Sequence, residues 1–332
     1  MTRSKIIGIG KYLPDRVVTN ADLEKLMDTS DEWIQERTGI KERRFVEPGK
    51  ETPSWMGAQA SLQALEMAGL KKDDVDFIIF ATLSPDYNFP GSGCPMQRHL
   101  DLPGIGALDV RNQCSGFVYS LAIADQFIKT GMYKNILVTC AEVQSTGIDL
   151  TTEGRDVAVI FGDGAGAVVV TASENPDKGI LASNMHADGN FDKELFTEEP
   201  GSIQPLRNNK QMLQKKTVFP YMNGRFVFKH AIQKFPAAIL EALDDAGLSL
   251  DDLDLLIPHQ ANKRITEAIQ HKLNLPDKKV YSNIERYGNT TAASIPIALC
   301  EAYEDGLIKD GSLVCTAAFG SGFTWGANLI RF

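Results

Sequence analysis

Several features are scarce in this 332-residue chain, and each scarcity argues against a class of protein. Its five cysteines lack the paired spacing of a disulfide framework, and no CxxC or Cys/His cluster typical of zinc is present. No apolar run approaches the ~20 residues that cross a bilayer, and the first residues lack the apolar core of a signal peptide. We therefore expect reduced thiols, no metal site, no membrane contact and a cytoplasmic location.

Positive charge is also in short supply. Lys and Arg number 34 against 43 Asp and Glu, which gives a net charge of -9. Nonspecific binding to nucleic acids requires an excess of positive charge that displaces counterions. The charge balance therefore argues against a nucleic-acid partner, whereas a hydrophobic content of 43% is ordinary for a globular protein with a large core.

An internal repeat dominates what is present. Residues 61–79, SLQALEMAGLKKDDVDFII, match residues 239–257, ILEALDDAGLSLDDLDLLI, at an offset of 178. Each copy reads as an amphipathic helix that ends at a glycine, an acidic connection and a short apolar strand. The repeat predicts a duplicated α/β protein with halves at 1–173 and 174–332. Two tandem Rossmann-like domains that share this pattern by chance are the alternative.

The expected strands are short and apolar on both faces, which is typical of a sheet buried between layers of helices. They are FIIFATL, NILVTCA, GAVVVTA, LLIPHQ and LVCTAAF. The glycine-rich GDGAGA at 162–167 lies between two apolar runs and does not open a helix, so it is not a dinucleotide-binding fingerprint. We expect a glycine hairpin inside the sheet there.

Cys114 lies between an apolar run that ends at Val110 and a helical pattern that begins at Phe117. Its thiol is therefore expected at a helix N-terminus, where the dipole and free N–H groups stabilise a thiolate and lower the thiol pKa. The other four cysteines are read as small buried hydrophobic residues. They are Cys94, Cys140, Cys300 and Cys315.

The repeat brings two more polar residues into consideration. Aligned with the first half, LLIPHQAN places His259 at the end of a buried strand, and the segment around Asn289 matches the one around Cys114. Because joints related by a pseudo-two-fold axis face each other, we expect the three side chains to converge. The plainer alternatives are a structural histidine and a helix-capping asparagine. A papain-like protease also has Cys, His and Asn in this order, but its local signature is absent.

Five motifs carry a resemblance to a known family: DVRNQCSGFVYSL, IPHQANKRI, RYGNTTAASIP, FGDGAGAVVV and FGSGFTWG. Nearly end to end, the chain resembles the β-ketoacyl-acyl carrier protein synthase III family of the thiolase superfamily. The resemblance implies an α/β thiolase-like fold, with duplicated halves in a five-layer α-β-α-β-α arrangement, and a homodimer. It also implies an acyltransferase that condenses an acyl-CoA primer with malonyl-acyl carrier protein to begin fatty acid synthesis, with these substrates and no cofactor.

The resemblance also implies roles for residues. Cys114 is expected to carry the acyl group as a thioester, and backbone N–H groups of Cys114 and Ser321 to form the oxyanion hole. His259 and Asn289 are expected to donate hydrogen bonds to the enolate that decarboxylation produces. The remaining expected contacts are CoA and pantetheine at Thr29, Trp33, Arg37, Arg155, Gly224 and Asn262, the acyl pocket at Phe89 (across the dimer) and Phe319, and carrier-protein docking at Lys229 and Arg264.

Some positions depart from the family pattern. Asn112 and Gln113 replace small residues before the nucleophile, and Ser321 replaces a glycine. The segment 196–221 is longer than usual, which predicts a lid or a dimer arm. These departures leave the chain length and branching of the acyl primer undetermined. A relative that does not decarboxylate, or one from secondary metabolism, is the alternative. The former needs a carboxylate base, for which Asp86 is the candidate, since no glutamate lies between positions 66 and 142.

Overall fold

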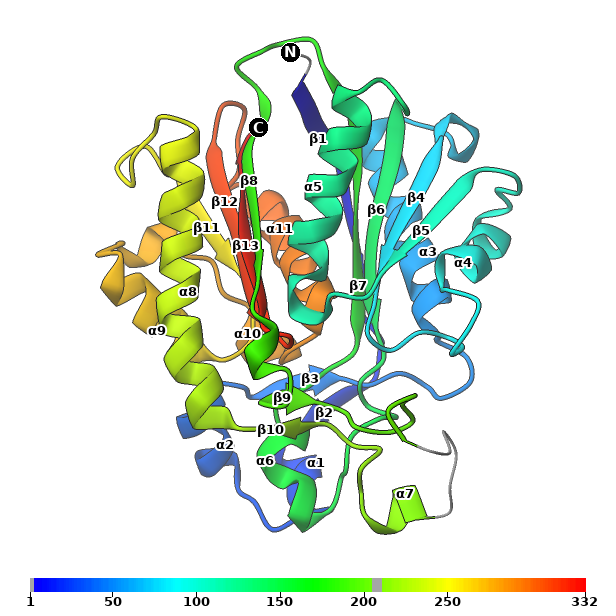
Figure 1. The fold of residues 1–332 in the computed structure, drawn as a ribbon, viewed down its shortest axis with the longest axis vertical. Coiled ribbons are helices and arrows are strands. Elements are labelled where there is room, and N and C mark those ends of the chain that lie inside the picture. The colour runs from blue at the N-terminus through cyan, green and yellow to red at the C-terminus, as the bar shows by residue number, and fades with distance from the viewer. Residues whose placement is uncertain (1–2, 205–210) are drawn as a thin grey trace.

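The computed structural model describes residues 3–204 and 211–332 and contains two central sheets (Figure 1). The first sheet has the strand order β1-β7-β6-β4-β5 and the second β11-β12-β13-β8. The strands of the first are β1 (Arg3–Tyr12), β4 (Phe77–Ala81), β5 (Gly106–Val110), β6 (Asn135–Glu142) and β7 (Gly164–Ser173). Those of the second are β8 (Gly179–Ala187), β11 (Leu255–Pro258), β12 (Leu313–Gly320) and β13 (Thr324–Arg331).

Both sheets are mixed in the same way. Strand β4 pairs in parallel with β5 and β6, and β7 and β1 follow antiparallel. In the second sheet β11 and β12 are parallel, and β13 and β8 follow antiparallel. Every residue of β4, β11 and β12 is buried, as expected for strands covered by helices on both faces.

Helices form the other three layers. In Figure 1, α5 (Gly116–Lys129) and α11 (Ser294–Glu304) lie between the sheets, α3 (Pro53–Ala68) and α4 (Gly93–Leu100) cover the outer face of the first, and α8 (Gly224–Asp245) and α9 (Lys263–Lys272) that of the second. Hydrophobic clusters fill each interface between layers. The predicted five-layer α-β-α-β-α arrangement is confirmed.

The duplication is visible in the element bounds. Shifted by the sequence offset of 178 residues, β6 becomes 313–320, the bounds of β12, and the short helix η2 (Gln113–Ser115) becomes η6 (Thr291–Ala293). The first residues of these two short helices share a left-handed backbone, with φ of 44° at Gln113 and 45° at Thr291. All strands of the first sheet precede those of the second, although the boundary between residues 173 and 174 stays a prediction.

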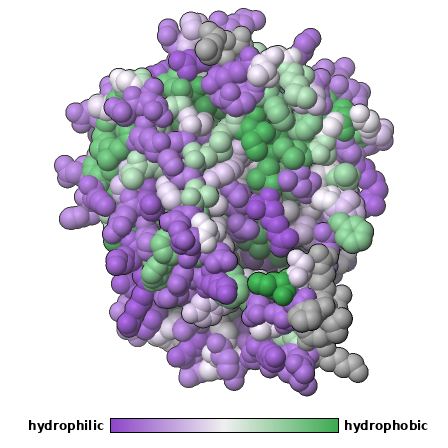
Figure 2. Space-filling model, in the orientation of Figure 1, coloured by the Kyte–Doolittle hydropathy of each residue, from purple (hydrophilic) through white to green (hydrophobic). Residues whose placement is uncertain are grey.

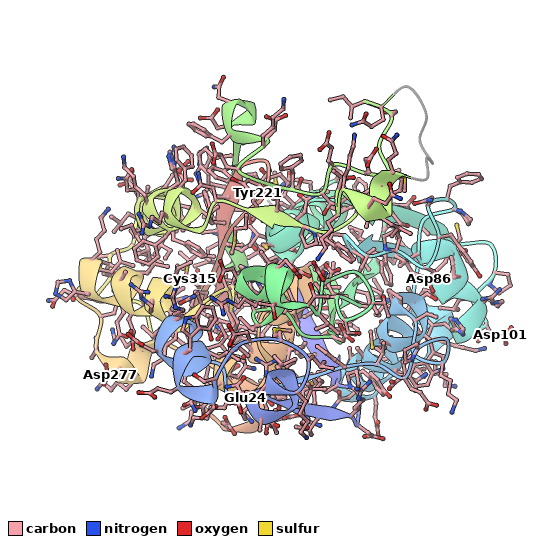
Figure 3. All side chains as sticks on the ribbon, turned by 90° about the horizontal axis from the view of Figure 1, so that it is seen from below. Glu24, Asp86, Asp101, Tyr221, Asp277 and Cys315 are labelled. Atoms are coloured by element: carbon pink, nitrogen blue, oxygen red, sulfur yellow. The ribbon has the colours of Figure 1, made fainter. Side chains whose placement is uncertain are left out.

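Small elements gather at one end of the sheets, opposite the two termini (Figure 1). They are β2 (Val17–Thr19), α1 (Asn20–Glu24), α2 (Asp31–Thr38), β3 (Glu42–Arg44), α6 (Arg155–Ala158), β9 (Leu195–Phe196), α7 (Gln211–Gln214), β10 (Tyr221–Met222) and α10 (Ile284–Tyr287). Of the long segment 196–221, residues 205–210 lie outside the described part. Seen from this end, the strand that carries Tyr221 lies across the molecule (Figure 3).

The predicted glycine hairpin at 162–167 is wrong. The run before it contains helix α6, and Gly164 and Gly166 lie inside strand β7. A Cβ at Gly166 would lie 2.8 Å from the backbone N of Ile297 and from Cβ of Pro296. These glycines therefore let α11 lie directly against the sheet, rather than turning the chain.

Gly166→Ala should lower the free energy of unfolding by about 1–3 kcal/mol, because the added methyl group overpacks the contact with α11. Urea unfolding measures this difference. Gly189→Ala is the matched control, since a Cβ at that position meets no atom within 4 Å and should change stability little. Equal stabilities of the two variants would contradict the close helix–strand contact.

Candidate active site

Cys114 lies in η2, directly before α5, as the sequence predicts. The residue is only 7% exposed and lines a cavity of about 750 Å³. The neighbouring β12 strand ends at Gly320, where a Cβ would lie 2.7 Å from Cβ and 3.3 Å from Sγ of Cys114. Only glycine leaves room for the thiol at this place.

The predicted lowering of the Cys114 pKa is wrong in direction. Burial raises the pKa of the thiol to about 12, and the charge of Glu142 raises it further, while a backbone hydrogen bond at the helix start lowers it. Desolvation of a thiolate in a closed pocket outweighs the helix terminus. The free thiol is therefore protonated near neutral pH.

His259 directly follows β11 and is buried. Its backbone N–H donates to the carbonyl of Ala317 at 2.8 Å, and its Nδ1 lies 2.6 Å from Oγ of Ser294. Nε2 is buried and has no hydrogen-bond partner among the described residues. Burial lowers the imidazole pKa to about 3, so the ring is neutral and one ring nitrogen awaits a partner.

Asn289 is held from both sides. Its backbone N–H donates to the carbonyl of Ile160 at 2.8 Å, and its Oδ1 accepts the N–H of Thr291 at 2.8 Å. Because the amide oxygen is engaged, Nδ2 is the atom that can donate to a substrate.

The elements that carry these residues meet where the two central helices begin. Helix η2 packs against η6, and a Cβ at Gly116 would lie 3.0 Å from Cβ of Ala292. Asn289 precedes η6, and Ser294, the partner of His259, follows it. The contact between repeat-related joints, which the sequence predicts, thus gathers the three segments.

Glu142 is a buried carboxyl group that the sequence reasoning missed. It ends strand β6, with its Oε2 accepting from Oγ of Ser84 at 2.8 Å and from Oγ1 of Thr82 and Nε2 of Gln144 at 3.2 Å. Burial raises its pKa to about 7, although these hydrogen bonds pull it down. The repeat could have pointed to Glu142, because the 178-residue offset pairs it with Gly320, and Gly320 lies beside the nucleophile.

Asp86 lies on the loop after β4, at the side of the molecule (Figure 3), and lines the cavity of Cys114. Its carboxylate accepts from the backbone N and Oγ of Ser54, at 3.1 and 2.6 Å, in the first turn of α3. The carboxylate of Asp86 therefore accepts hydrogen bonds at the start of α3, which is a structural role. Nothing else among the described residues around it supports a role as a general base.

Three other predicted site residues, Ser321, Phe89 and Phe319, differ in how they lie relative to the cavity of Cys114. Ser321 lines the same cavity, and its Oγ donates to the carbonyl of Leu195 in β9. Phe89 is 84% exposed on the loop after β4, so it does not fill the cavity of its own chain. Phe319 is not among the residues that line this cavity; its ring packs with Phe323 in the cluster between β12 and α8, and its place in the acyl pocket stays a prediction.

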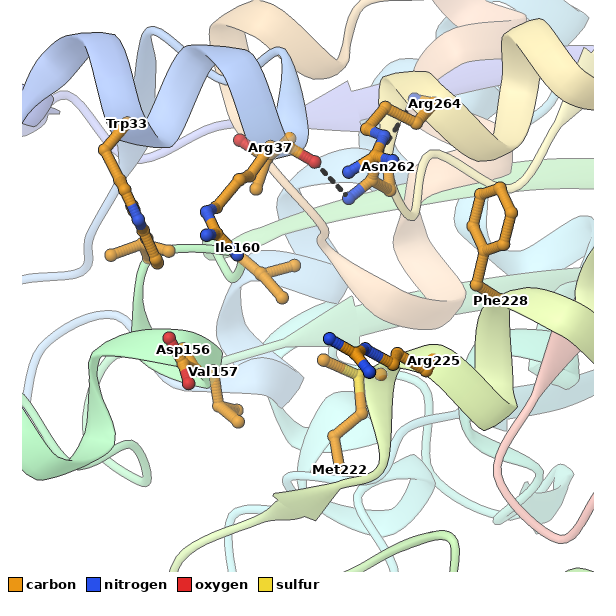
Figure 4. Close-up of a pocket in the computed structure, with 13 residues that line it drawn as sticks. Trp33, Arg37, Asp156, Val157, Ile160, Met222, Arg225, Phe228, Asn262 and Arg264 are labelled. Carbon is orange, nitrogen blue, oxygen red and sulfur yellow. Dashed lines mark hydrogen bonds between the residues drawn. The ribbon is translucent and has the colours of Figure 1, made fainter.

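A second cavity of about 610 Å³ lies among α2, α8 and α9 (Figure 4). Arg37 stacks on the ring of Trp33, 4.4 Å from its centroid, and Arg155 approaches the same ring at 5.4 Å. Trp33 is half-buried in the first turn of α2, where the Ser30 side chain accepts its backbone N–H and caps the helix. Two guanidinium groups on one indole suit a flat aromatic ligand with phosphate groups.

The remaining predicted contacts lie near this cavity. Asn262 caps α9, and its Nδ2 donates to the carbonyl of Arg37 at 2.9 Å. Asn262, Gly224 and Arg264 line the cavity, and Lys229 is exposed on α8. Thr29 is not among the residues that line it, and its Oγ1 is buried without a hydrogen-bond partner among the described residues.

The described residues contain neither a candidate metal site nor a helix that could span a membrane. No group of three or more His, Cys, Asp and Glu side chains within residues 3–204 and 211–332 is arranged to hold a metal ion. Over the same ranges, every helix is too short or too polar to cross a bilayer.

The fold and the site together place the chain in the class of thiolase-like condensing enzymes. Family models described as 3-oxoacyl-[acyl-carrier-protein] synthase III and its C-terminal part match residues 108–189 and 243–332. The β-ketoacyl-[acyl-carrier-protein] synthase III of Caldanaerobacter subterraneus is 48% identical over 98% of this chain and 97% of its own. The chain belongs to the β-ketoacyl-[acyl-carrier-protein] synthase III family.

Solved structures agree. The 3-oxoacyl-[acyl-carrier-protein] synthase III of Aquifex aeolicus superposes with a TM-score of 0.91 and 46% identity, covering 99% of this chain and 100% of its own. The priming β-ketosynthase of the R1128 polyketide pathway reaches a TM-score of 0.90 at 32% identity, covering 99% and 96%. The same fold is therefore found both in a 3-oxoacyl-[acyl-carrier-protein] synthase III and in a priming β-ketosynthase of a polyketide pathway.

Glu142→Gln should change how stability depends on pH. Because burial raises the pKa of Glu142 from 4.5 to about 7, the folded chain holds this proton more tightly than the unfolded chain. The free energy of unfolding should therefore fall as pH rises from about 4.5 to 7, by on the order of 3 kcal/mol. Urea unfolding across this range should show the fall in the parent and in exposed Glu66→Gln, but not in Glu142→Gln.

Proposed function

We propose that this protein condenses an acyl-CoA primer with malonyl-acyl carrier protein, as a cytoplasmic β-ketoacyl-acyl carrier protein synthase III that begins fatty acid synthesis. One observation carries the proposal. A buried thiol at the start of α5 opens on a cavity, and its short helix η2 packs against η6. The oriented carboxamide of Asn289 lies just before η6, and Ser294, the partner of the neutral imidazole of His259, lies just after it.

The first step is acyl transfer to Cys114. Sγ attacks the thioester carbonyl, the bond from carbonyl carbon to CoA sulfur breaks, and the thiol proton ends on the departing CoA. Because the thiolate is the nucleophile and burial raises the pKa of the thiol, the proton has to leave Sγ as the bond to the carbonyl carbon forms. The backbone N–H groups of Cys114 and Ser321 are the proposed oxyanion hole.

The second step is decarboxylation and carbon–carbon bond formation. The malonyl thioester loses carbon dioxide, and its electron pair becomes an enolate that attacks the acyl-Cys114 carbonyl and expels the thiolate, which then takes up one proton. Nε2 of His259 and Nδ2 of Asn289 are the proposed donors to the enolate oxygen. Loss of one such donor typically costs ~3 kcal/mol of transition-state stabilisation.

Substrate binding is assigned to the second cavity. Trp33, Arg37 and Arg155 are proposed to hold the adenine and phosphate groups of CoA. Its pantetheine arm is proposed to pass Thr29, Gly224 and Asn262. Lys229 and Arg264 near the mouth are proposed to dock the acidic carrier protein, since both cations lie on the exposed surface of α8 and α9. The two acyl thioesters are substrates, and the proposed chemistry needs no cofactor.

A homodimer is part of the proposal. Strand β5 pairs only with β4 among the described strands, so its other edge is free to pair with a second copy. Figure 2 shows apolar side chains gathered over α5 and the neighbouring strands of the first sheet. Phe89 is exposed on the loop that leads away from β4, and it is proposed to reach the acyl cavity of a partner.

Glu142 favours one second candidate, a condensation that does not decarboxylate. A buried carboxyl with a pKa near 7 has the properties of a general base. Its oxygens already accept several hydrogen bonds, however, which favours a structural role. Carbon dioxide release in step with CoA release separates the two reactions.

Cys114→Ala should abolish CoA release from the primer, because no sulfur remains to accept the acyl group. His259→Ala and Asn289→Ala should still become acylated but should release carbon dioxide from malonyl thioester roughly a hundredfold more slowly. Mass spectrometry of the acyl-enzyme and trapped carbon dioxide report the two steps. Cys94 is exposed in the structure, so the prediction that it is buried is wrong; Cys94→Ala is the control and should behave as the parent. Parental condensation by Asn289→Ala would refute its role.

Trp33→Ala should raise the KM for acyl-CoA roughly fivefold to tenfold, because the indole is lost from between two guanidinium groups. The KM for malonyl-carrier protein is the internal control, since that substrate has no adenine. Initial rates with each substrate varied in turn measure both constants. An equal rise in both would contradict the placement of adenine at this ring.

A further inference from the structure

We propose that Ser294 is a positioning residue that fixes the proton of His259 on Nε2, so that the imidazole enters the reaction as a hydrogen-bond donor and not as a base. The inference rests on the proposed function for its consequence in catalysis. Its structural part, the tautomer of His259 in the free protein, stands on hydrogen bonds alone.

The hydrogen bonds around the Ser294 hydroxyl decide the tautomer. Oγ accepts the backbone N–H of Gln260 at 3.2 Å and lies 2.6 Å from Nδ1 of His259. A hydroxyl has one proton to donate, and Ser294 is only 2% exposed. If Nδ1 carried the proton, that hydroxyl hydrogen would be buried without an acceptor among the described residues. Ser294 therefore donates to Nδ1, and the imidazole proton is on Nε2.

Neither partner of the hydroxyl is free to turn away. The Gln260 side chain donates to the carbonyl of Pro258 at 2.7 Å and accepts the backbone N–H of Asn283 at 3.1 Å, which holds the segment after β11. The His259 backbone is bound to β12, and Ser294 is the first residue of α11. The bond from Ser294 to His259 thus joins a strand end of the second sheet to a central helix.

The outcome is a desolvated donor. Nε2 is buried and has no partner among the described residues, a state that costs free energy until an acceptor arrives. Burial also keeps the ring neutral, so a second proton does not replace the effect of Ser294. The opposite tautomer would aim a lone pair at the same place and repel a developing enolate oxygen.

Ser294→Ala tests the proposal in two readouts. Nitrogen-15 spectra of labelled histidine, with the His259 signal assigned by its loss in His259→Ala, should show Nε2–H in the parent and a mixture of tautomers in Ser294→Ala. Acylation of Cys114 should stay within twofold, while kcat for condensation falls roughly tenfold, less than the roughly hundredfold fall expected when the donor itself is lost. Ser294→Thr, which keeps the hydroxyl, should restore both readouts.

Ser120→Ala is the matched control, because Ser120 is buried in the other central helix and its Oγ has no partner among the described residues. It should leave the tautomer and both rates unchanged. Nδ1–H in the parent, or parental condensation by Ser294→Ala, would overturn the proposal. A parent that releases neither CoA nor carbon dioxide would instead overturn the proposed function, and the spectra would still decide the tautomer.

Discussion

The contact between the starts of α5 and α11 is the constraint on which the site depends. These helices belong to different halves of the duplicated chain, and the site exists only because η2 and η6 touch. Small residues make the approach possible, since a Cβ at Gly116 would crowd Ala292 and one at Gly320 would strike Cys114. The nucleophile and the proposed donors therefore share a single packing requirement.

Burial then sets the electrostatics of the pocket. It raises the pKa of Cys114 and Glu142 and lowers that of His259, so each group is pushed towards its neutral form. Closing a pocket of neutral donors costs little free energy of desolvation. These donors then interact strongly with a negative oxygen that forms inside the pocket. Chemistry that creates an enolate without removing a carbon-bound proton suits these surroundings better than chemistry that needs an ionised base.

The residue patterns predicted the repeat, the sheets covered by helices and the position of Cys114, because these depend on local periodicity and on a pattern repeated at a fixed offset. The five-layer arrangement was implied by the family resemblance. The prediction failed at Gly164 and Gly166, whose sequence is typical of a turn. In the structure these two glycines leave room for α11, a helix about 130 residues further along the chain. The direction of the Cys114 pKa depended on burial, which no linear motif reports.

The amino-acid sequence by itself determined the secondary structure, the duplicated architecture and, through its motifs, the family, since neighbouring residues carry all three. Only the tertiary structure decided that Glu142 is a buried carboxyl group, that Asn289 presents its amide nitrogen and that Ser294 orients His259. These properties come from hydrogen bonds and desolvation between segments far apart in the chain, and such interactions exist only once both sheets have closed on the central helices.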